Sequence, residues 1–394
     1  MPNAGPLDGI KVVDFTRYLA GPFCTQILGD YGAEVLKIEP VEGARGELGG
    51  YSGKDSYFFM STNRSKKSVQ ISTRSAEGRG VIQRLIDDAD VVIDNFRPGV
   101  IEALGFGYEA VAARNPRIIA CSVSGFGSNG PMRDYPGFDQ IAQGFSGLMS
   151  VTGTAESGPT RVGIAICDLL GGIFAAQGIL LALEARHRTG RGQKVETSLI
   201  EAIISTLSWS AGIYFDTGKT PGPAGNNHPL SSPHGVFQAA DRPFNIAVGN
   251  DAMWRTFVEV IGRPELANDP RFIGAGPRLK NREELTAEIN RALADYPAQY
   301  WIELFNQKGI PSGPILTVEE MFNHPQIAAR EMLLRMAHPA RGEFLTTGLG
   351  VKLEDTPGKV TRPPLLGEHT QEVLLAHGYS MEELQRLRSA KAIG

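Results

Sequence analysis

The chain has 394 residues, 42% hydrophobic and 21% charged, which allows two domains or one large α/β body with an insertion. Its 39 Lys and Arg against 43 Asp and Glu give a formal net charge of −4, which argues against broad electrostatic binding of nucleic acid or of an anionic membrane. Glycine reaches 47 residues without a collagen-like period, so the excess predicts tight turns and close backbone approaches rather than disorder.

The first half of the chain alternates short apolar runs with amphipathic stretches, which predicts βαβ units around a parallel sheet. The predicted strands lie at 10–16, 33–39, 68–72, 90–96, 117–126 and 162–166. The predicted helices lie at 20–32, 76–89, 98–115 and 168–193. Residues 194–200 then lead into a further apolar helical stretch that ends at Phe215.

The composition changes after residue 215. Residues 216–235 are rich in Gly, Pro, Asn and Ser, which marks a linker or a substrate loop. A hairpin and a helix start are predicted at 236–251, and amphipathic helices at 254–322 are typical of a smaller domain. Residues 342–353 resemble sheet again, and 363–378 a helix that follows two prolines.

Cysteine usage and the N-terminus indicate the compartment. Cys24, Cys121 and Cys167 show no CxxC or His spacing, so we expect neither a disulfide framework nor a metal site, and a reducing, cytoplasmic compartment. The first nine residues lack the regions of a signal peptide. Residues 169–183, the most apolar stretch, are judged too short to span a bilayer, which predicts a buried core helix and no membrane contact.

Two glycine and acid patterns suggest a dinucleotide site, but both are weak. The G-x-G-x-x-G match at 125–130 is followed by Pro131, so no helix N-terminus faces the loop, and a plain turn is the better interpretation. Glu39 closes the second predicted strand, as a ribose-binding acid would. The first turn, 16–22, lacks the glycine fingerprint, so we expect a Rossmann-like scaffold without bound NAD.

Asp168 is the strongest candidate for a reactive residue. It is the only charge between Arg161 and Glu184, and it lies between a predicted apolar strand and an apolar helix. It can cap that helix, and a strand-to-helix switch is also where α/β sheets bind ligands. The helix N-terminus is expected to keep the carboxylate ionised, as a nucleophile requires. Gly171 and Gly172 either make room for a substrate or allow close helix packing.

Several cations could hold a phosphorylated ligand. Arg64, Lys66 and Lys67 cluster before the third strand, whereas Arg74 and Arg97 follow strand ends. Cofactors dock at the carboxyl ends of such strands, which favours Arg74 and Arg97, but a solvated surface explains the cations equally well.

Taken together, the order and spacing of these segments resemble the class III CoA-transferases, the group that includes formyl-CoA transferase and carnitine CoA-transferase. The resemblance covers nearly the whole chain. The matching segments are 12–40, 63–71, 95–109, 146–153, 162–183, 186–193 and 363–370.

The resemblance implies a Rossmann-like α/β large domain with a parallel sheet, formed by both chain ends, plus a smaller inserted α+β domain. The corresponding boundaries are 1–215 and 331–394 for the large domain and 216–330 for the linker and the small domain. It also implies an interlocked homodimer, no permanently bound cofactor, and a CoA thioester as substrate.

Asp168 matches the family's catalytic aspartate, which forms an aspartyl mixed anhydride and then an enzyme–CoA thioester. Nearby backbone N–H groups are expected to stabilise the oxyanion. The implied CoA-binding residues are Ala20, Ile71, Arg74, Asn95, Phe96 and Arg97.

The chain also departs from the formyl-CoA pattern. Pro40 and Ala103 replace two cations, so Arg64, Lys66 or Lys67 are expected to substitute in phosphate binding. Because of these two replacements, the sequence does not determine which cations bind the CoA phosphates. A separate difference concerns the acceptor: residues 226–235, which include His228 and His234, stand in place of a glycine-rich active-site loop, which counts against a formyl or oxalate substrate.

The residue at position 138 distinguishes a transferase from a racemase. The related α-methylacyl-CoA racemases use a histidine before the aspartate that corresponds to Asp139, and phenylalanine cannot act as that second base. Phe138, Asp139 and His234 are predicted at the substrate pocket, with Arg17 or His234 as candidates for the acceptor carboxylate.

We therefore predict transfer of CoA from an acyl-CoA, such as succinyl-CoA, to a small carboxylic acid. The alternatives are an enzyme acting at the α-proton of acyl-CoA and a non-catalytic CoA-binding protein.

Overall fold

The computed structural model describes residues 5–41 and 56–394, and these form two compact units. Unit 1 contains the described residues up to Met149, together with Arg161–Thr220 and Ala329–Gly394. Unit 2 contains Ser150–Thr160 and Pro221–Ala328.

Unit 1 is built on a six-stranded parallel sheet with the strand order β3-β2-β1-β4-β5-β6. Its central strands are apolar and buried, as expected for a sheet covered on both faces. The order reverses between β1 and β4, the topological switch point where such sheets bind ligands. The strands are β1 Lys11–Asp14, β2 Glu34–Glu39, β3 Lys67–Gln70, β4 Val91–Asp94, β5 Ile119–Ser124 and β6 Lys194–Ser198.

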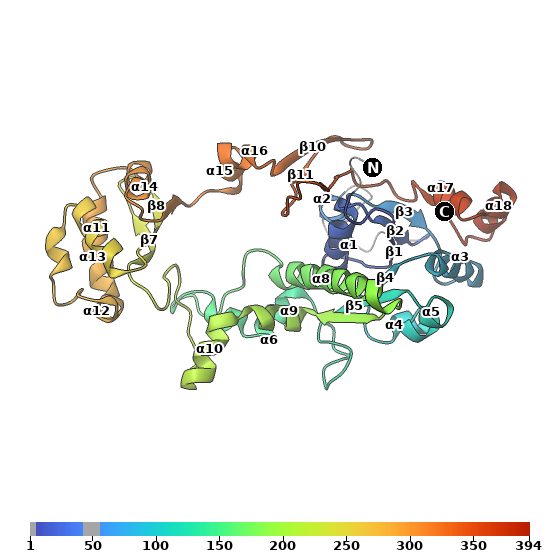
Figure 1. Cartoon of the computed structure of the whole chain (residues 1–394), viewed down its shortest axis with the longest axis horizontal. Coiled ribbons are helices and arrows are strands. Elements are labelled where there is room, and N and C mark those ends of the chain that lie inside the picture. Colours follow the sequence, from blue (N-terminus) through green and yellow to red (C-terminus); the bar gives the residue numbers. More distant parts are fainter. Residues whose placement is uncertain (1–4, 42–55) are drawn as a thin grey trace. The chain divides into compact units, whose positions relative to one another are not determined.

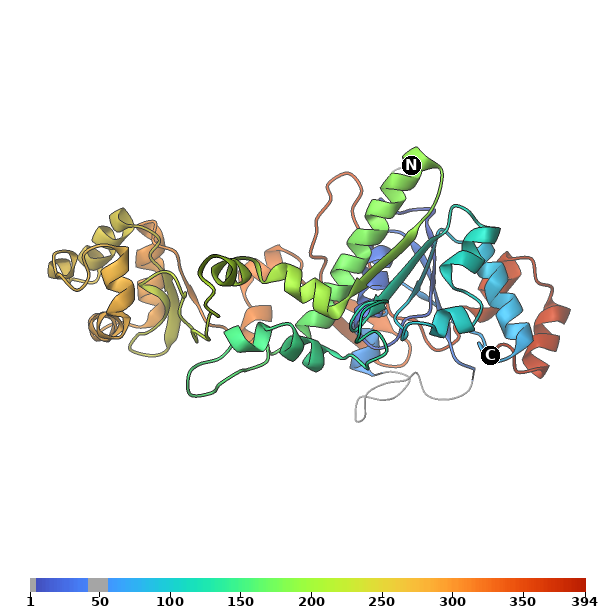
Figure 2. The same cartoon turned by 90° about the horizontal axis from the view of Figure 1, so that it is seen from below.

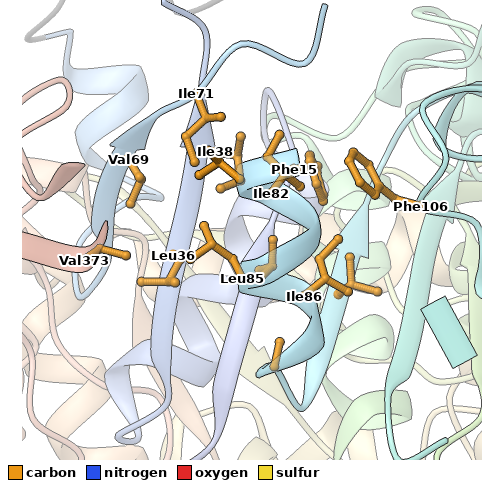
Figure 3. Packing of buried hydrophobic residues seen from close by; sticks show 14 of the residues in the cluster. Phe15, Leu36, Ile38, Val69, Ile71, Ile82, Leu85, Ile86, Phe106 and Val373 are labelled. Carbon is orange, nitrogen blue, oxygen red and sulfur yellow. The ribbon is translucent and has the colours of Figure 1, made fainter. Parts of the chain in front are cut away.

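One core cluster joins this sheet to helices α3 (Ala76–Asp87), α5 (Tyr108–Arg114), α17 (Thr370–Ala376) and α18 (Met381–Ser389). Ile82, Leu85 and Ile86 of α3 meet Leu36 and Phe15, as Figure 3 shows. The first turn of α3 is closed by Ser75, whose hydroxyl accepts from the Gly78 amide.

The second core cluster joins the sheet to helices α1 (Ala20–Asp30), α8 (Ile166–Thr189) and α9 (Leu199–Thr206) (Figures 1 and 2). A Cβ at Gly172 would lie 2.5 Å from the Ala20 carbonyl oxygen, and one at Gly171 would lie 3.0 Å from Leu199 Cδ2. Of the two roles considered for these glycines, room for a substrate or close helix packing, the structure therefore favours close packing of α8. The helix ends at Gly190, whose φ is 69°.

Two predicted elements are wrong. Residues 162–166 form no strand, because the Val162 amide donates to Gln143 Oε1 instead of to a sheet neighbour, and α8 already begins at Ile166. The helix predicted at 98–115 is two, α4 (Val100–Ala103) and α5, separated at Gly105, whose φ of 89° suits glycine.

Helix α8 passes a length and composition test for crossing a membrane, with a mean hydropathy of 1.9 in its most apolar window. The expectation that this stretch is too short is therefore wrong. Cys167, Ala175, Ile179 and Leu183 are nevertheless buried against the sheet and α1, so α8 is a core helix of unit 1.

The remaining elements of unit 1 flank these layers. They are α2 Tyr57–Met60, α6 Asp139–Phe145, α7 Leu148–Val151 (which ends in unit 2), α10 Ser208–Thr217, and a hairpin of β10 Leu333–His338 and β11 Gly342–Thr347.

Unit 2 packs helices on a three-stranded antiparallel sheet, β7-β8-β9 (Figure 1). Phe244, Phe257 and Phe305 are fully buried in its core. Its elements are β7 His234–Gln238, β8 Pro243–Ala247, β9 Ser312–Pro314, α11 Asp251–Val260, η2 Pro264–Ala267, α12 Ala275–Lys280, α13 Arg282–Leu293, α14 Ala298–Gln307, α15 Val318–Phe322 and α16 Pro325–Ala329, of which the last residue belongs to unit 1.

Candidate active site

Both strands at the switch point end in a buried aspartate that folds the following loop. The Thr16 amide donates to Asp14 Oδ1 at 2.7 Å, and the Phe96 amide donates to Asp94 Oδ1 at 3.0 Å. Each contact spans two residues, which is the Asx-turn pattern. The loops after β1 and β4 therefore leave the sheet with fixed directions.

The side chain of Asn95 joins these two loops. Its Oδ1 accepts from the Arg17 amide at 2.8 Å, and its Nδ2 donates to the Arg17 carbonyl at 2.7 Å. The Arg17 guanidinium lies 5.8 Å from the centre of the Phe96 ring. The Asn95 amide thus holds the Arg17 loop in place.

A cleft of about 280 Å³, here cleft A, opens beyond these loops. It brings together Asp168, Phe138 and four of the predicted CoA-binding residues, which are Ala20, Asn95, Phe96 and Arg97. Its other lining residues are Tyr18, Leu19, Pro98, Val123, Ser124, Gly125, Arg133, Tyr135, Pro136, Gly137 and Leu199.

Asp168 lies in the first turn of α8 but does not cap it, because the N-cap residue is Ala165. The capping contact comes from Asp139 on α6, whose Oδ1 accepts from the Cys167 amide at 2.9 Å. Gln143 donates to the other oxygen of Asp139 at 2.6 Å. Asp139 is therefore buried beside Asp168 and outside the cleft lining, and it leaves the Asp168 carboxyl available to the cleft.

Burial and the neighbouring Asp139 carboxylate raise the pKa of Asp168 to about 7. The expectation that the helix N-terminus keeps this group fully ionised is thus wrong, because loss of solvent outweighs the helix dipole. The amides of Ile166, Cys167 and Leu169 already donate to Ile164, Asp139 and Ala165, so these three are not oxyanion donors.

The pKa of Asp168 gives a test through its neighbour. Asp139→Asn removes a negative charge beside Asp168 and should lower the pH at which activity is half-maximal from about 7 by roughly half to one unit. A pH profile of kcat/KM measures this midpoint. An unchanged or higher midpoint would contradict the placement of Asp139. Glu196→Gln, on β6 and outside cleft A, is the control and should leave the midpoint unchanged.

A second cleft of about 520 Å³, here cleft B, lies at the ends of β1, β2 and β3. Phe96 lines both clefts. Arg17 lines cleft B, and the next residue, Tyr18, lines cleft A. Ile71 and Arg74, the other two predicted CoA-binding residues, lie here. The remaining lining residues are Phe15, Ile38, Glu39, Pro40, Val41, Ser72, Thr73, Ser75, Ala390 and Lys391.

The three cations expected to replace missing phosphate ligands form ion pairs with carboxylates of the protein instead. Arg64 is buried in an ion pair with Asp30 at 2.8 Å. Lys66 is buried against Asp14, and burial lowers the pKa of Lys66 to about 7. Lys67 pairs with two carboxylates, and none of the three lines either cleft. That expectation is therefore wrong, because Arg64 and Lys66 form buried ion pairs and Lys67 pairs with Glu34 and Glu372 nearer the surface.

The sequence interpretation missed two residues of cleft A. Tyr18 has a φ of 64°, rare for a side chain of this size, and its ring meets Phe138 edge-on at 6.0 Å. Arg133 follows the glycine motif, at which the sequence predicts only a plain turn. Two arginines, Arg97 and Arg133, therefore line cleft A, and a guanidinium group suits carboxylate or phosphate; that of Arg133 also lies 3.3 Å from Asp134.

His234 belongs to unit 2 and stacks on His228 with ring centres 4.6 Å apart. Burial and the neighbouring His228 lower the pKa of His234. Both rings line a cleft of about 580 Å³ within that unit. Across residues 5–41 and 56–394, no three His, Cys, Asp or Glu side chains gather as a metal site would require.

Cleft A, which Asp168 lines, is bordered by the loops after β1 and β4, at the switch point where such sheets bind ligands. The sequence model of CoA-transferase family III matches residues 7–370. The chain belongs to this family and is an enzyme that transfers CoA from an acyl-CoA to a small carboxylic acid, as predicted.

The relatives cover most of the chain. The acetyl-CoA:oxalate CoA-transferase of Acetobacter aceti is 42% identical over 92% of this chain and 94% of its own. The human succinyl-CoA:glutarate CoA-transferase is 34% identical over 95% of this chain and 86% of its own. A crystal structure of a CAIB/BAIF family protein from Brucella suis has a TM-score of 0.83 and 34% identity, covering 96% of this chain and 100% of that one.

Proposed function

We propose that Asp168 is the nucleophile of the transfer. A carboxylate oxygen attacks the donor thioester, the C–S bond breaks, and CoA thiolate leaves an aspartyl mixed anhydride. The thiolate then attacks the Asp168 carbonyl and expels the donor carboxylate, which gives an enzyme–CoA thioester. The acceptor carboxylate attacks that thioester and releases CoA thiolate. The thiolate finally takes the acceptor acyl group and restores the Asp168 carboxylate.

The observation that supports this assignment most strongly is that, among the described residues, Asp168 carries the only carboxyl or thiol group that lines cleft A. Burial raises the pKa of the adjacent Cys167 thiol to about 12, so the thiol stays protonated. The oxygens of Asp139 accept from the Cys167 amide and from Gln143, and Arg161 lies 3.7 Å from one of them. A pKa of about 7 leaves Asp168 half ionised at neutral pH, with little solvent to stabilise the charge.

We propose that the CoA thioester lies with its acyl end in cleft A and its nucleotide in cleft B. The six residues that the family resemblance implies for CoA divide between these clefts, and Phe96 lines both. Cleft B also carries Arg17 and Arg74, which suit phosphate groups.

The acceptor is proposed to be a small dicarboxylic acid. The relatives are named for oxalate, glutarate, D-citramalate and mesaconate, all dicarboxylic acids. The missing glycine-rich loop was expected to count against oxalate as the acceptor. Because the 42% identical relative is named for oxalate, that expectation no longer excludes oxalate here. Arg97 and Arg133 line cleft A and supply cations for the second carboxylate. Of the two candidates named from the sequence, Arg17 lines cleft B and His234 belongs to unit 2.

We propose a homodimer in the cytoplasm. Helix α8 exposes Ile173, Leu180 and Leu181, and α10 exposes Trp209 and Phe215, an apolar surface that a second copy would cover. The interlocked arrangement rests on the family resemblance. The three cysteines are free and buried, which fits a reducing compartment.

A donor–acceptor assay separates transfer from α-proton chemistry. Succinyl-CoA with a panel of dicarboxylic acids in deuterated water should give a new CoA thioester, identified by mass spectrometry, without deuterium at the donor's α-carbon. Phe138 offers no proton-exchanging group, which is the reason for the second expectation. Deuterium uptake without any acceptor would favour the racemase-like alternative, and neither product would favour a non-catalytic CoA-binding protein.

A further inference from the structure

The C-terminal tail enters cleft B through an unusual helix end. After α18, the Lys391 amide donates to the Arg388 carbonyl and the Ala392 amide to the Leu387 carbonyl, each at 2.9 Å. These two bonds form a Schellman motif, in which the residue at the position of Lys391 is most often glycine. Lys391 has a φ of 53°, a conformation that disfavours any residue with a Cβ. A lysine side chain therefore occupies a position where glycine suits the backbone better.

The tail beyond Lys391 is fixed to the edge of the sheet. The Ser72 amide donates to the Ala392 carbonyl at 2.9 Å, and Ile393 forms an antiparallel bridge with Ile71. Ala392 and Ile393 are buried in the core beside β3. The backbone of Lys391 is thus held on both sides, and its side chain lines cleft B together with Arg74.

The order of the strands places Lys391 far from the nucleophile. Asp168 lies in cleft A with residues that follow β1, β4 and β5, whereas the tail joins the end of β3. From β1, β4 and β5 to β3 the sheet order spans two to four intervals of about 4.8 Å, or roughly 10 to 19 Å. A ligand that reaches both places must be long, with its reacting group at one end and a charged group at the other.

We propose that Lys391 binds the 3′-phosphate of CoA and thereby distinguishes CoA from its dephosphorylated form. The proposal rests on the proposed CoA site, in which the thioester lies beside Asp168. The adenosine 3′-phosphate then lies at the end of the molecule opposite to the reacting carbon. Among the described residues, cleft B is lined by three cations, Arg17, Arg74 and Lys391, against one carboxylate, Glu39, which accepts from Ser68.

The variant Lys391→Gly separates binding from folding. Glycine removes the Cβ at a left-handed position, so the melting temperature of the full chain should stay the same or rise. Isothermal titration should show a Kd for CoA raised about ten-fold, as expected for one lost charge-assisted contact. The Kd for 3′-dephospho-CoA should change less than about two-fold, because that ligand lacks the group that the lysine binds.

Two further variants serve as controls. Lys391→Arg keeps the cation and should keep the preference for CoA. Glu331→Gly changes another left-handed residue, with a φ of 53° and outside both clefts, and should affect neither Kd.

Unchanged CoA affinity in Lys391→Gly, or an equal loss for both ligands, would overturn the role of Lys391 while leaving the proposed function intact. Wild-type protein that transfers no CoA and binds neither ligand would instead overturn the proposed function, and this inference with it.

Discussion

Asp168→Asn should lower the rate of CoA transfer by at least about 10³-fold, because the amide is a poor nucleophile and cannot form the mixed anhydride. Acyl-CoA should still bind, since the two clefts keep their other lining residues. Steady-state assays and equilibrium titration with CoA measure the two quantities separately. Retained turnover in Asp168→Ala as well, which cannot revert by deamidation, would contradict the nucleophile assignment.

The same variant should be more stable than the wild type above pH 7. The pKa of Asp168 is about 7 in the folded protein against an ordinary value of 3.8, so the stability that the proton confers is complete below about pH 4 and lost as the pH rises through 7. Asparagine avoids that loss. We expect about 2 kcal/mol at pH 8, after allowing for partial solvent contact, and almost no difference at pH 4. Denaturant titrations at the two pH values test the sign.

Asp14→Asn should destabilise the protein by about 3–5 kcal/mol, because it leaves the buried amino groups of Lys37 and Lys66 without their counter-charge. Asp14 is fully buried, with Lys66 Nζ at 3.3 Å and Lys37 Nζ at 3.9 Å. Although burial raises it, these two cations hold the pKa of Asp14 below its ordinary value. Urea unfolding measures the loss.

Two comparisons make the Asp14 prediction specific. Asp14→Asn/Lys66→Met removes one of the uncompensated charges and should recover part of the stability. Asp87→Asn breaks the exposed pair with Arg114 and should cost less than about 1 kcal/mol. A loss in Asp14→Asn as small as in Asp87→Asn would show that the buried cluster does not stabilise the fold.

Most of the sheet could be predicted from the sequence, because short apolar strands alternating with amphipathic helices admit few arrangements. Strands β1 to β5 and helices α1, α3 and α8 lie where the pattern indicates. Residues 162–166 are as apolar as a strand, yet the Val162 amide finds its acceptor in Gln143, a contact between elements that no local pattern encodes.

The candidate site, too, could be predicted only in part from the sequence. Asp168 stands out in the sequence because it is an isolated charge between apolar segments. The pKa of its carboxyl depends on Asp139, which is 29 positions earlier in the chain and is brought close only by the packing of α6 against α8. Arg64 and Lys66 resemble surface cations in the sequence, whereas Asp30 and Asp14 hold them in the interior. No local pattern marks Lys391, because only the pairing of the tail beside the end of β3 brings it to cleft B.

The nucleophile is tested most directly by trapping the enzyme–CoA thioester. The full-length protein is mixed with succinyl-CoA without acceptor, reduced with borohydride, digested and mapped by mass spectrometry. Reduction of a thioester at Asp168 converts that residue to homoserine, and the conversion should require acyl-CoA. Homoserine at position 168 is the predicted result. Modification at Asp139 instead, or an unmodified peptide from protein that turns over with an acceptor, would contradict the account.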